Sequence, residues 1–214
     1  MLKKAIRYLS NPGKYLHIIN RRIITHVVYK RSLKSMGERT VIGKPLLMTP
    51  KCVSIGNNVL IWPNCRIEGI TRYNDIDYTP EIFLDDFCSI QQNLHLTCAN
   101  KIYIGKHTAI AANVTITDIH HQYENINKPI EEQDILVKQV HISDDCKIYN
   151  NAVILPGTHI GKHCTVGANS VVSGEFPDFS VIAGSPAKIV KRYNFDSLAW
   201  EKTNAKGEFL RIKE

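Results

Sequence analysis

The sequence lacks any long hydrophobic run, although 43% of its 214 residues are hydrophobic. No apolar stretch approaches the roughly 18 to 20 residues that a membrane-spanning helix needs. The start of the chain, MLKKAIRYLSNPGKYLHIINRR, interrupts its apolar stretches with Asn, Pro, Gly and Lys, which is not the pattern of a secretory signal. We therefore expect a cytoplasmic protein with one moderate domain and short appendages.

Acidic residues are absent from positions 1–36, which carry nine of the 27 lysines and arginines. The net charge is +7, so the rest of the chain carries about −2, that is, +7 less nine. Apolar residues recur at helical spacing here, so residues 1–38 are predicted to form a basic amphipathic helical segment. Its role is open between peripheral contact with an anionic membrane and a helical cap on the next domain. No aromatic and basic stacking pattern follows, which argues against nucleic acid.

A β-branched aliphatic residue returns at every sixth position in the second half of the chain. The consecutive matches are Ile142, Ile148, Ile154, Ile160, Val166 and Val172. A period of six fits neither an α-helix nor an alternating strand, but it fits a coil with three flat faces and 18 residues per turn. We predict an all-β fold, a left-handed parallel β-helix of hexapeptide repeats over residues 39–190.

The fourth residue after each aliphatic should also point inward, near a corner, and should therefore be small. The residues at these positions are Cys65, Cys88, Thr108, Cys146, Ala152, Thr158, Cys164 and Ser170. Four of the six cysteines thus belong to the repeat, and no CxxC pair occurs, so we predict reduced core cysteines without a disulfide framework or zinc site. Gly and Asn are expected to take strained backbone conformations at the corners.

The repeat is interrupted twice, over residues 68–83 and 117–139, where we expect loops to leave the prism. The second loop begins with Asp118, His120 and His121. A neutral imidazole can remove a proton from an attacking hydroxyl or amine, and a nearby carboxylate such as Asp118 can fix its tautomer. A three-histidine metal site would have to bring His95 together with His120 and His121, and we predict that no metal is required.

Two stretches, IGKHTAIAANVTITDIHHQYENINKPI and AVILPGTHIGKHCTVGANSVVSGEFPDFSVIAGSPAKIVKRY, resemble the hexapeptide-repeat acetyltransferases. The most similar branch contains the sugar and polysaccharide O-acetyltransferases, relatives of galactoside and maltose acetyltransferases. The resemblance covers about residues 40–192. It implies a homotrimer that binds acetyl-CoA between neighbouring prisms and acetylates a hydroxyl of a sugar, polysaccharide or lipid-linked glycan.

The resemblance also implies site residues. His121 falls at the position of the family's general base, with His120 as the fallback, and Gln91 and Asn93 fall on the acceptor side. The cofactor-binding positions that it implies are Lys147, Asn150, Ala168, Ser173, Lys188 and Lys191. Lys147 stands where the family often has a tryptophan.

Other functions remain open on the sequence. An N-acetyltransferase of an amino sugar, nucleotide-linked or free, would use the same base and cofactor groove. A non-catalytic scaffold or a metal-dependent hydratase could be built on the same prism, because a fold does not fix a function. Residues 191–214 are predicted to form a short C-terminal helix or a tail.

Overall fold

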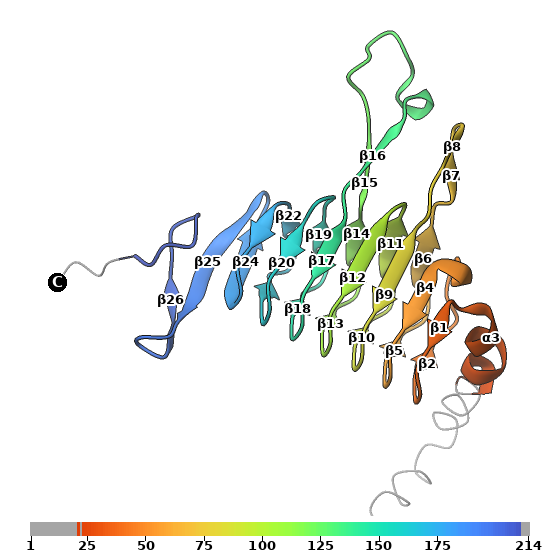
Figure 1. Cartoon of the computed structure of the whole chain (residues 1–214). Helices are drawn as coiled ribbons and strands as arrows, with labels where there is room; N and C mark the ends of the chain where they lie inside the picture. Colours follow the sequence, from red (N-terminus) through yellow and green to blue (C-terminus); the bar gives the residue numbers. More distant parts are fainter. Residues whose placement is uncertain (1–20, 22, 211–214) are drawn as a thin grey trace, which may run out of the picture.

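The computed structural model describes residue 21 and residues 23–210, and its main body is a three-sided prism of stacked parallel strands (Figure 1). We name the three sheets faces A, B and C. Face A contains, in spatial order, β1 (Ser35–Met36), β4 (Val53–Ile55), β9 (Glu81–Leu84), β12 (Lys101–Ile104), β17 (Val140–Ile142), β20 (His159–Ile160) and β23 (Glu175–Phe176). Face B contains β2 (Val41–Ile42), β5 (Leu60–Ile61), β10 (Ser89–Ile90), β13 (Ala109–Ile110), β18 (Lys147–Ile148), β21 (Thr165–Val166), β24 (Ser180–Gly184), β25 (Ala187–Asn194) and β26 (Ala199–Lys202). Face C contains β22 (Val171–Val172), β19 (Val153–Ile154), β14 (Thr115–Thr117), β11 (His95–Cys98), β6 (Arg66–Gly69) and β3 (Leu47–Met48).

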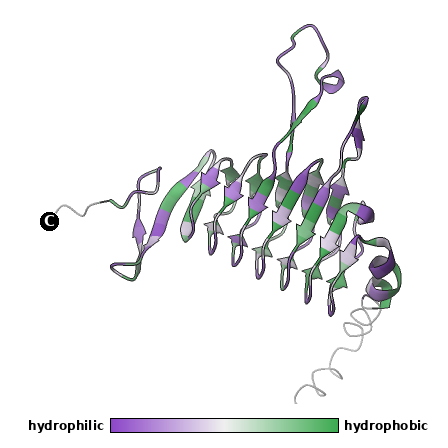
Figure 2. Cartoon of the chain, viewed as in Figure 1, coloured by the Kyte–Doolittle hydropathy of each residue, from purple (hydrophilic) through white to green (hydrophobic). Residues whose placement is uncertain are grey.

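The aliphatic residues of the six-residue repeat form the core of the prism. Equivalent positions in successive coils pair in register, as Ile142 does with Ile160 and Ile148 with Val166. All six positions of the run from Ile142 to Val172 have no exposed surface. Hydrophobic and hydrophilic residues alternate along the strands (Figure 2), as expected where successive side chains point into and out of the prism. The predicted repeat architecture is confirmed.

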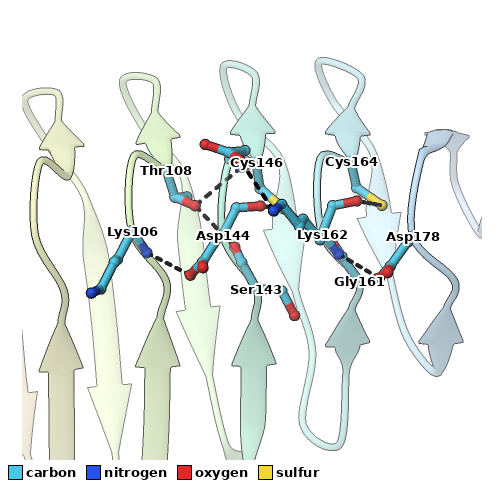
Figure 3. Close-up of polar contacts among 10 residues, drawn as sticks. Lys106, Thr108, Ser143, Asp144, Cys146, Gly161, Lys162, Cys164 and Asp178 are labelled. Atoms are coloured by element: carbon cyan, nitrogen blue, oxygen red, sulfur yellow. Dashed lines mark hydrogen bonds and ion pairs between the residues drawn. The ribbon is translucent and has the colours of Figure 1, made fainter.

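The corners between faces A and B are closed by hydrogen bonds between adjacent coils (Figure 3). The Asp178 carboxylate accepts a bond of 2.7 Å from the backbone N–H of Lys162. A Cβ on Gly161 would lie 2.5 Å from the Asp178 nitrogen, so this glycine is needed for close approach of the coils. The expectation of a strained backbone is wrong for Gly161, but correct for corner asparagines such as Asn151, whose φ is 60°.

All six cysteines are free and buried, including the four at repeat positions for which a core role was predicted. Cys146 shows why a thiol suits the inward corner position. Its Sγ donates to the Gly161 carbonyl at 3.2 Å, and its backbone N–H donates to Thr108 Oγ1 at 3.2 Å (Figure 3). The small polar side chains therefore satisfy backbone groups between coils without disturbing the core.

Two insertions leave the prism at the edge where face C passes to face A (Figure 1). The first is a hairpin of β7 (Arg72–Tyr73) and β8 (Ile76–Asp77), between β6 and β9. The second runs between β14 and β17, with β15 (Ile119–His121) and β16 (Ile135–Val137) forming an antiparallel stem and η3 (Ile130–Glu132) lying in the loop. Both predicted interruptions are therefore real protrusions, and they rise side by side.

The N-terminal end of the prism is capped by η1 (Thr25–Tyr29) and α3 (Lys30–Ser32), while η2 (Pro50–Cys52) precedes β4. Thr25 is fully buried, and its hydroxyl accepts a 3.0 Å bond from the backbone N–H of Ile42; Leu33 joins the core. The cap also carries apolar side chains that are each about half accessible: Ile23, Ile24, Val27 and Val28. Residues 1–20 and 22 of the predicted basic amphipathic segment lie outside the described residues.

The C-terminal end corrects a prediction. Residues 191–210 were expected to form a helix or tail, but β25 folds back antiparallel on β24, and β26 pairs antiparallel with β25. The reason is that Ile189 on β25 is buried on the last coil, which gives the segment an apolar contact in extended form. Within residues 21 and 23–210, no helix is long and apolar enough to cross a membrane.

Candidate active site

A cavity of about 330 Å³ lies outside face C, at the base of the two protrusions, and we call it the first cavity. Its floor comes from β6, β11 and β14, whose outward side chains lie in register across the face. Its walls come from the hairpin and from the loop stem. The lining residues that bear on chemistry are Arg66, Tyr73, His95, Thr97, Thr117 and His121.

The two loop histidines point to opposite sides of the stem. Successive residues of a strand face opposite directions, and on β15 His121 lines the first cavity whereas His120 does not. His120 lines a second cavity of about 240 Å³, together with Leu136, Lys138 and Ser173. The stem therefore stands between two cavities, each lined by one of the two loop histidines, and His120 faces away from His95 and His121.

His121 is contacted by Tyr73 of the hairpin, which in turn contacts Glu131 of the loop. Tyr73 Oη lies 3.3 Å from His121 Nδ1, and the two rings meet edge to face at a centroid distance of 5.3 Å. The same Tyr73 Oη lies 2.9 Å from the Glu131 carbonyl oxygen and 3.2 Å from Glu131 Oε2. Sequence reasoning missed both partners. The sequence did contain a hint, because both interruptions fall at the same point of the 18-residue coil. Residues of the two protrusions are therefore expected to lie close together.

Asp118 does not pair with either histidine, which corrects the predicted catalytic role. It is fully buried, and its two carboxylate oxygens accept 2.8 Å bonds from the backbone N–H groups of Ala99, Asn100 and Lys101. The Cys98 thiol adds a further bond at 3.3 Å. A carboxylate with these partners is turned into the prism, so Asp118 holds the base of the loop against the adjacent coil.

His95 stands on the floor of the first cavity, between Arg66 and Thr115 in the register of face C. Partial burial, and secondarily the positive charge of Arg66, lower the pKa of His95 below its ordinary value. Its ring is therefore neutral at pH 7 and can both donate and accept a hydrogen bond. Arg66 is itself paired with Glu68. Among residues 21 and 23–210, no group of three or more His, Cys, Asp or Glu side chains is arranged to hold a metal ion.

The predicted acceptor residues lie elsewhere. Asn93 sits at a corner between faces B and C with φ of 61°, and its Nδ2 donates to Asn113 Oδ1 at 3.0 Å. Asn113, Asn151 and Asn169 continue this ladder of side-chain bonds along the corner. Neither Asn93 nor Gln91 lines the two cavities described here. In this chain the Asn93 side chain has a structural partner at the corner, and the acceptor role of Asn93 and Gln91 stays a prediction.

The predicted cofactor residues are spread over the last coils. Ser173 lines the second cavity with His120. Asn150 and Ala168 are exposed at the corner between faces B and C, and the Lys147 ammonium lies 5.5 Å from the centre of the Tyr149 ring. Lys188 and Lys191 are exposed on β25. Ser173 lies at one edge of face C and Asn150 and Ala168 at the other, whereas Lys147, Lys188 and Lys191 lie on strands of face B, so a single chain does not gather them into one groove.

Comparison with known proteins decides the family. Residues 139–174 match the model of the bacterial transferase hexapeptide (six repeats) family. WbbJ of Escherichia coli K12, named as a lipopolysaccharide biosynthesis O-acetyl transferase, is 38% identical over 209 residues, which cover 94% of this chain and 99% of that protein. The chain belongs to the hexapeptide-repeat acetyltransferase family. It is accordingly an acyltransferase built on the family's left-handed parallel β-helix.

Other known proteins match over shorter stretches or at lower identity. The galactoside O-acetyltransferase of Lactococcus lactis is 31% identical over 48% of this chain and 48% of its own length. Among solved structures, the Bacillus cereus N-acyltransferase AntD, in complex with dTDP and 3-hydroxybutyryl-CoA, has a TM-score of 0.66 at 19% identity, covering 80% of this chain and 89% of AntD. These structural likenesses support the fold.

Proposed function

We propose that the protein transfers an acetyl group from acetyl-CoA to a hydroxyl of a sugar or of a polysaccharide or lipid-linked glycan. The observation that carries the proposal is the full-length similarity to WbbJ, whose name gives O-acetyl transfer in lipopolysaccharide biosynthesis. The first cavity supports it, because its floor offers the hydroxyls of Thr97 and Thr117, the His95 ring and Arg66. About 330 Å³ is at the small end of ligand pockets, which suits one sugar ring.

The reaction follows from the position of His121 at the first cavity. Its Nε2 takes the proton of the acceptor hydroxyl as the hydroxyl oxygen attacks the thioester carbonyl carbon. The carbon–sulfur bond then breaks, the imidazolium returns the proton to the CoA sulfur, and the acetyl ester and free thiol leave. A direct transfer is favoured over an acyl-enzyme because all six cysteines are buried.

The cofactor would lie on the other side of the stem, toward the last coils, and would supply the activated acetyl thioester. Ser173 and His120 line the second cavity, which would hold part of the pantetheine arm while the thioester reaches the acceptor beside His121. Lys188 and Lys191 would meet its phosphates. Because Asn150 and Ala168 lie across face C from Ser173, a groove between two copies would use both sets, which favours a homotrimer.

The test is thiol release from acetyl-CoA with a panel of glycosides and amino sugars, in the presence of EDTA. We expect acceptor-dependent release and a base-labile acetyl ester on the product. Thiol release with amino sugars alone would favour N-acetylation instead. AntD, by its name, catalyses the related N-acyl transfer. Absence of release, together with no rise in melting temperature on adding acetyl-CoA, would contradict acyl transfer.

We also propose that the N-terminal segment rests on an anionic membrane surface at the cytoplasmic side, near a lipid-linked acceptor. The cap packs through Thr25 and Leu33 and turns its apolar residues outward. The segment 1–36 has nine basic residues and no acid, which complements anionic head groups. An apolar face beside basic residues is the pattern of a helix lying in the membrane interface.

Replacing Val27 and Val28 with aspartate tests this contact. We expect the full chain to sediment with phosphatidylglycerol vesicles, and the double variant to bind at least about tenfold more weakly, because two exposed valines that would enter the membrane interface are replaced by negative charges. The matched control places aspartate at Ile126 and Leu198, which are highly exposed and far from the cap. Equal vesicle binding by the two double variants, or no binding by the unaltered protein, would contradict the proposal. A change in the oligomeric state of the Val27 and Val28 variant in the absence of lipid would also contradict it.

A further inference from the structure

Tyr73 occupies the one point where the hairpin, the loop and His121 meet. Its hydroxyl has three polar neighbours: His121 Nδ1 at 3.3 Å, the Glu131 carbonyl oxygen at 2.9 Å and Glu131 Oε2 at 3.2 Å. Both Glu131 atoms can only accept a hydrogen bond, because one is a carbonyl and the other belongs to a carboxylate. A phenol has a single proton, so the distribution of protons in this cluster is constrained.

The phenol proton can point toward His121 or toward Glu131. The two arrangements differ in how many pairs of hydrogen-bond acceptors face each other without a proton between them. If Tyr73 donates to His121, both Glu131 oxygens face the phenol oxygen without a proton between them. If Tyr73 donates to Glu131, its oxygen is free to accept, and His121 Nδ1 must carry the proton that it donates. The second arrangement leaves fewer acceptors facing each other, because the phenol proton lies toward Glu131 and the Nδ1 proton toward the phenol oxygen. It also leaves His121 Nε2 unprotonated.

We infer that Tyr73 is a positioning residue that accepts the Nδ1 proton of His121 and thereby presents Nε2 as the base. The inference rests on the proposed function of His121 and deepens it. Tyr73 thus has the orienting role that the sequence suggested for Asp118. The Tyr73–Glu131 pair would further stabilise the imidazolium formed during transfer, since a carboxylate lies behind the phenol.

The surroundings keep Tyr73 protonated and in place. Burial, together with the hydrogen bond to Glu131, raises the pKa of Tyr73 above its ordinary value. The neighbouring Asn74 donates from Nδ2 to the Gln133 carbonyl at 3.2 Å. Gln133 in turn is buried and bonds to the backbone of Asn125 and Lys128. The hairpin is therefore attached to a well-bonded part of the loop, which fixes Glu131 relative to Tyr73.

Tyr73→Phe removes the hydroxyl and keeps the ring edge against His121. We expect kcat to fall about 10- to 100-fold, the cost typical of losing an orienting partner, with KM for acetyl-CoA and the melting temperature unchanged. The matched control is Tyr78→Phe in the segment just after the hairpin, since the described residues give Tyr78 no hydrogen bond to His121. Glu131→Gln should lower kcat as well, because its amide can donate to Tyr73 and release the phenol proton toward His121.

Ring nitrogen-15 NMR of histidine-labelled protein reads the tautomer without using activity. With the His121 signal assigned by its loss in His121→Ala, we expect the Nδ1–H form in the unaltered protein and a mixture of tautomers in Tyr73→Phe. An Nε2–H form in the unaltered protein, or a kcat of Tyr73→Phe equal to that of Tyr78→Phe, would overturn the inference. If His121→Ala retained full activity, the proposed function of His121 would fail instead, whichever tautomer is observed.

Discussion

His121→Ala is expected to lower kcat for acetyl transfer by about 1,000-fold, the contribution of a positioned general base. The reason is geometric: His121 is the loop histidine that lines the first cavity, and its Nδ1 is engaged by Tyr73. The side chain is exposed at the cavity and makes no contribution to the core, so the variant should fold normally. The measurement is steady-state thiol release with the acceptor identified from the panel.

The neighbouring histidine provides the control for this prediction. His120 has the same chemistry and lies on the same strand but faces the second cavity. His120→Ala should therefore raise KM for acetyl-CoA while kcat changes much less than in His121→Ala. His159→Ala, on the outside of face A, should change neither constant. A large loss of kcat in His120→Ala with little change in His121→Ala would exchange the two roles and contradict the assignment of the base.

The fold was predictable because its rules are local. An aliphatic residue every six positions and a small residue four places later specify the inward face of each strand, and both sets proved to be buried. Each repeat contacts only its neighbours, so the pattern determines the architecture without knowledge of distant contacts. The C-terminal segment escaped prediction because its antiparallel pairing depends on the last coil, where Ile189 finds its contact.

The site was only partly predictable because it depends on contacts between the two segments that leave the repeat. The spacing located His120 and His121 but could not tell which face of the stem each would take. Proximity in sequence suggested Asp118 as the partner, whereas strand alternation turns that carboxylate into the prism. The actual partner, Tyr73, is 48 residues away in the hairpin. Such a contact requires knowing that both protrusions rise from the same edge.

Asp118→Ala is expected to lower the free energy of unfolding by about 3 kcal/mol, because the loss leaves buried backbone donors without an acceptor. The amides of residues 99–101 all donate to this fully buried carboxylate, so the substitution removes the acceptor of all three. For a chain of this size, the melting temperature should fall by about 6 to 12 °C. Thermal unfolding followed by circular dichroism measures the effect.

A structural role for Asp118 predicts a loss of stability without a comparable loss of activity. Asp75→Ala removes an exposed carboxylate whose ion pair with Arg72 is fully solvated, and it should leave stability within about 0.5 kcal/mol. Asp118→Asn keeps the shape but turns an amide N–H₂ toward a backbone donor, so it should also destabilise. Below the melting transition, both Asp118 variants should keep most of their kcat, because Tyr73 and Glu131 still hold His121. A loss of kcat comparable to that of His121→Ala, without a fall in melting temperature, would mean that Asp118 orients the base after all.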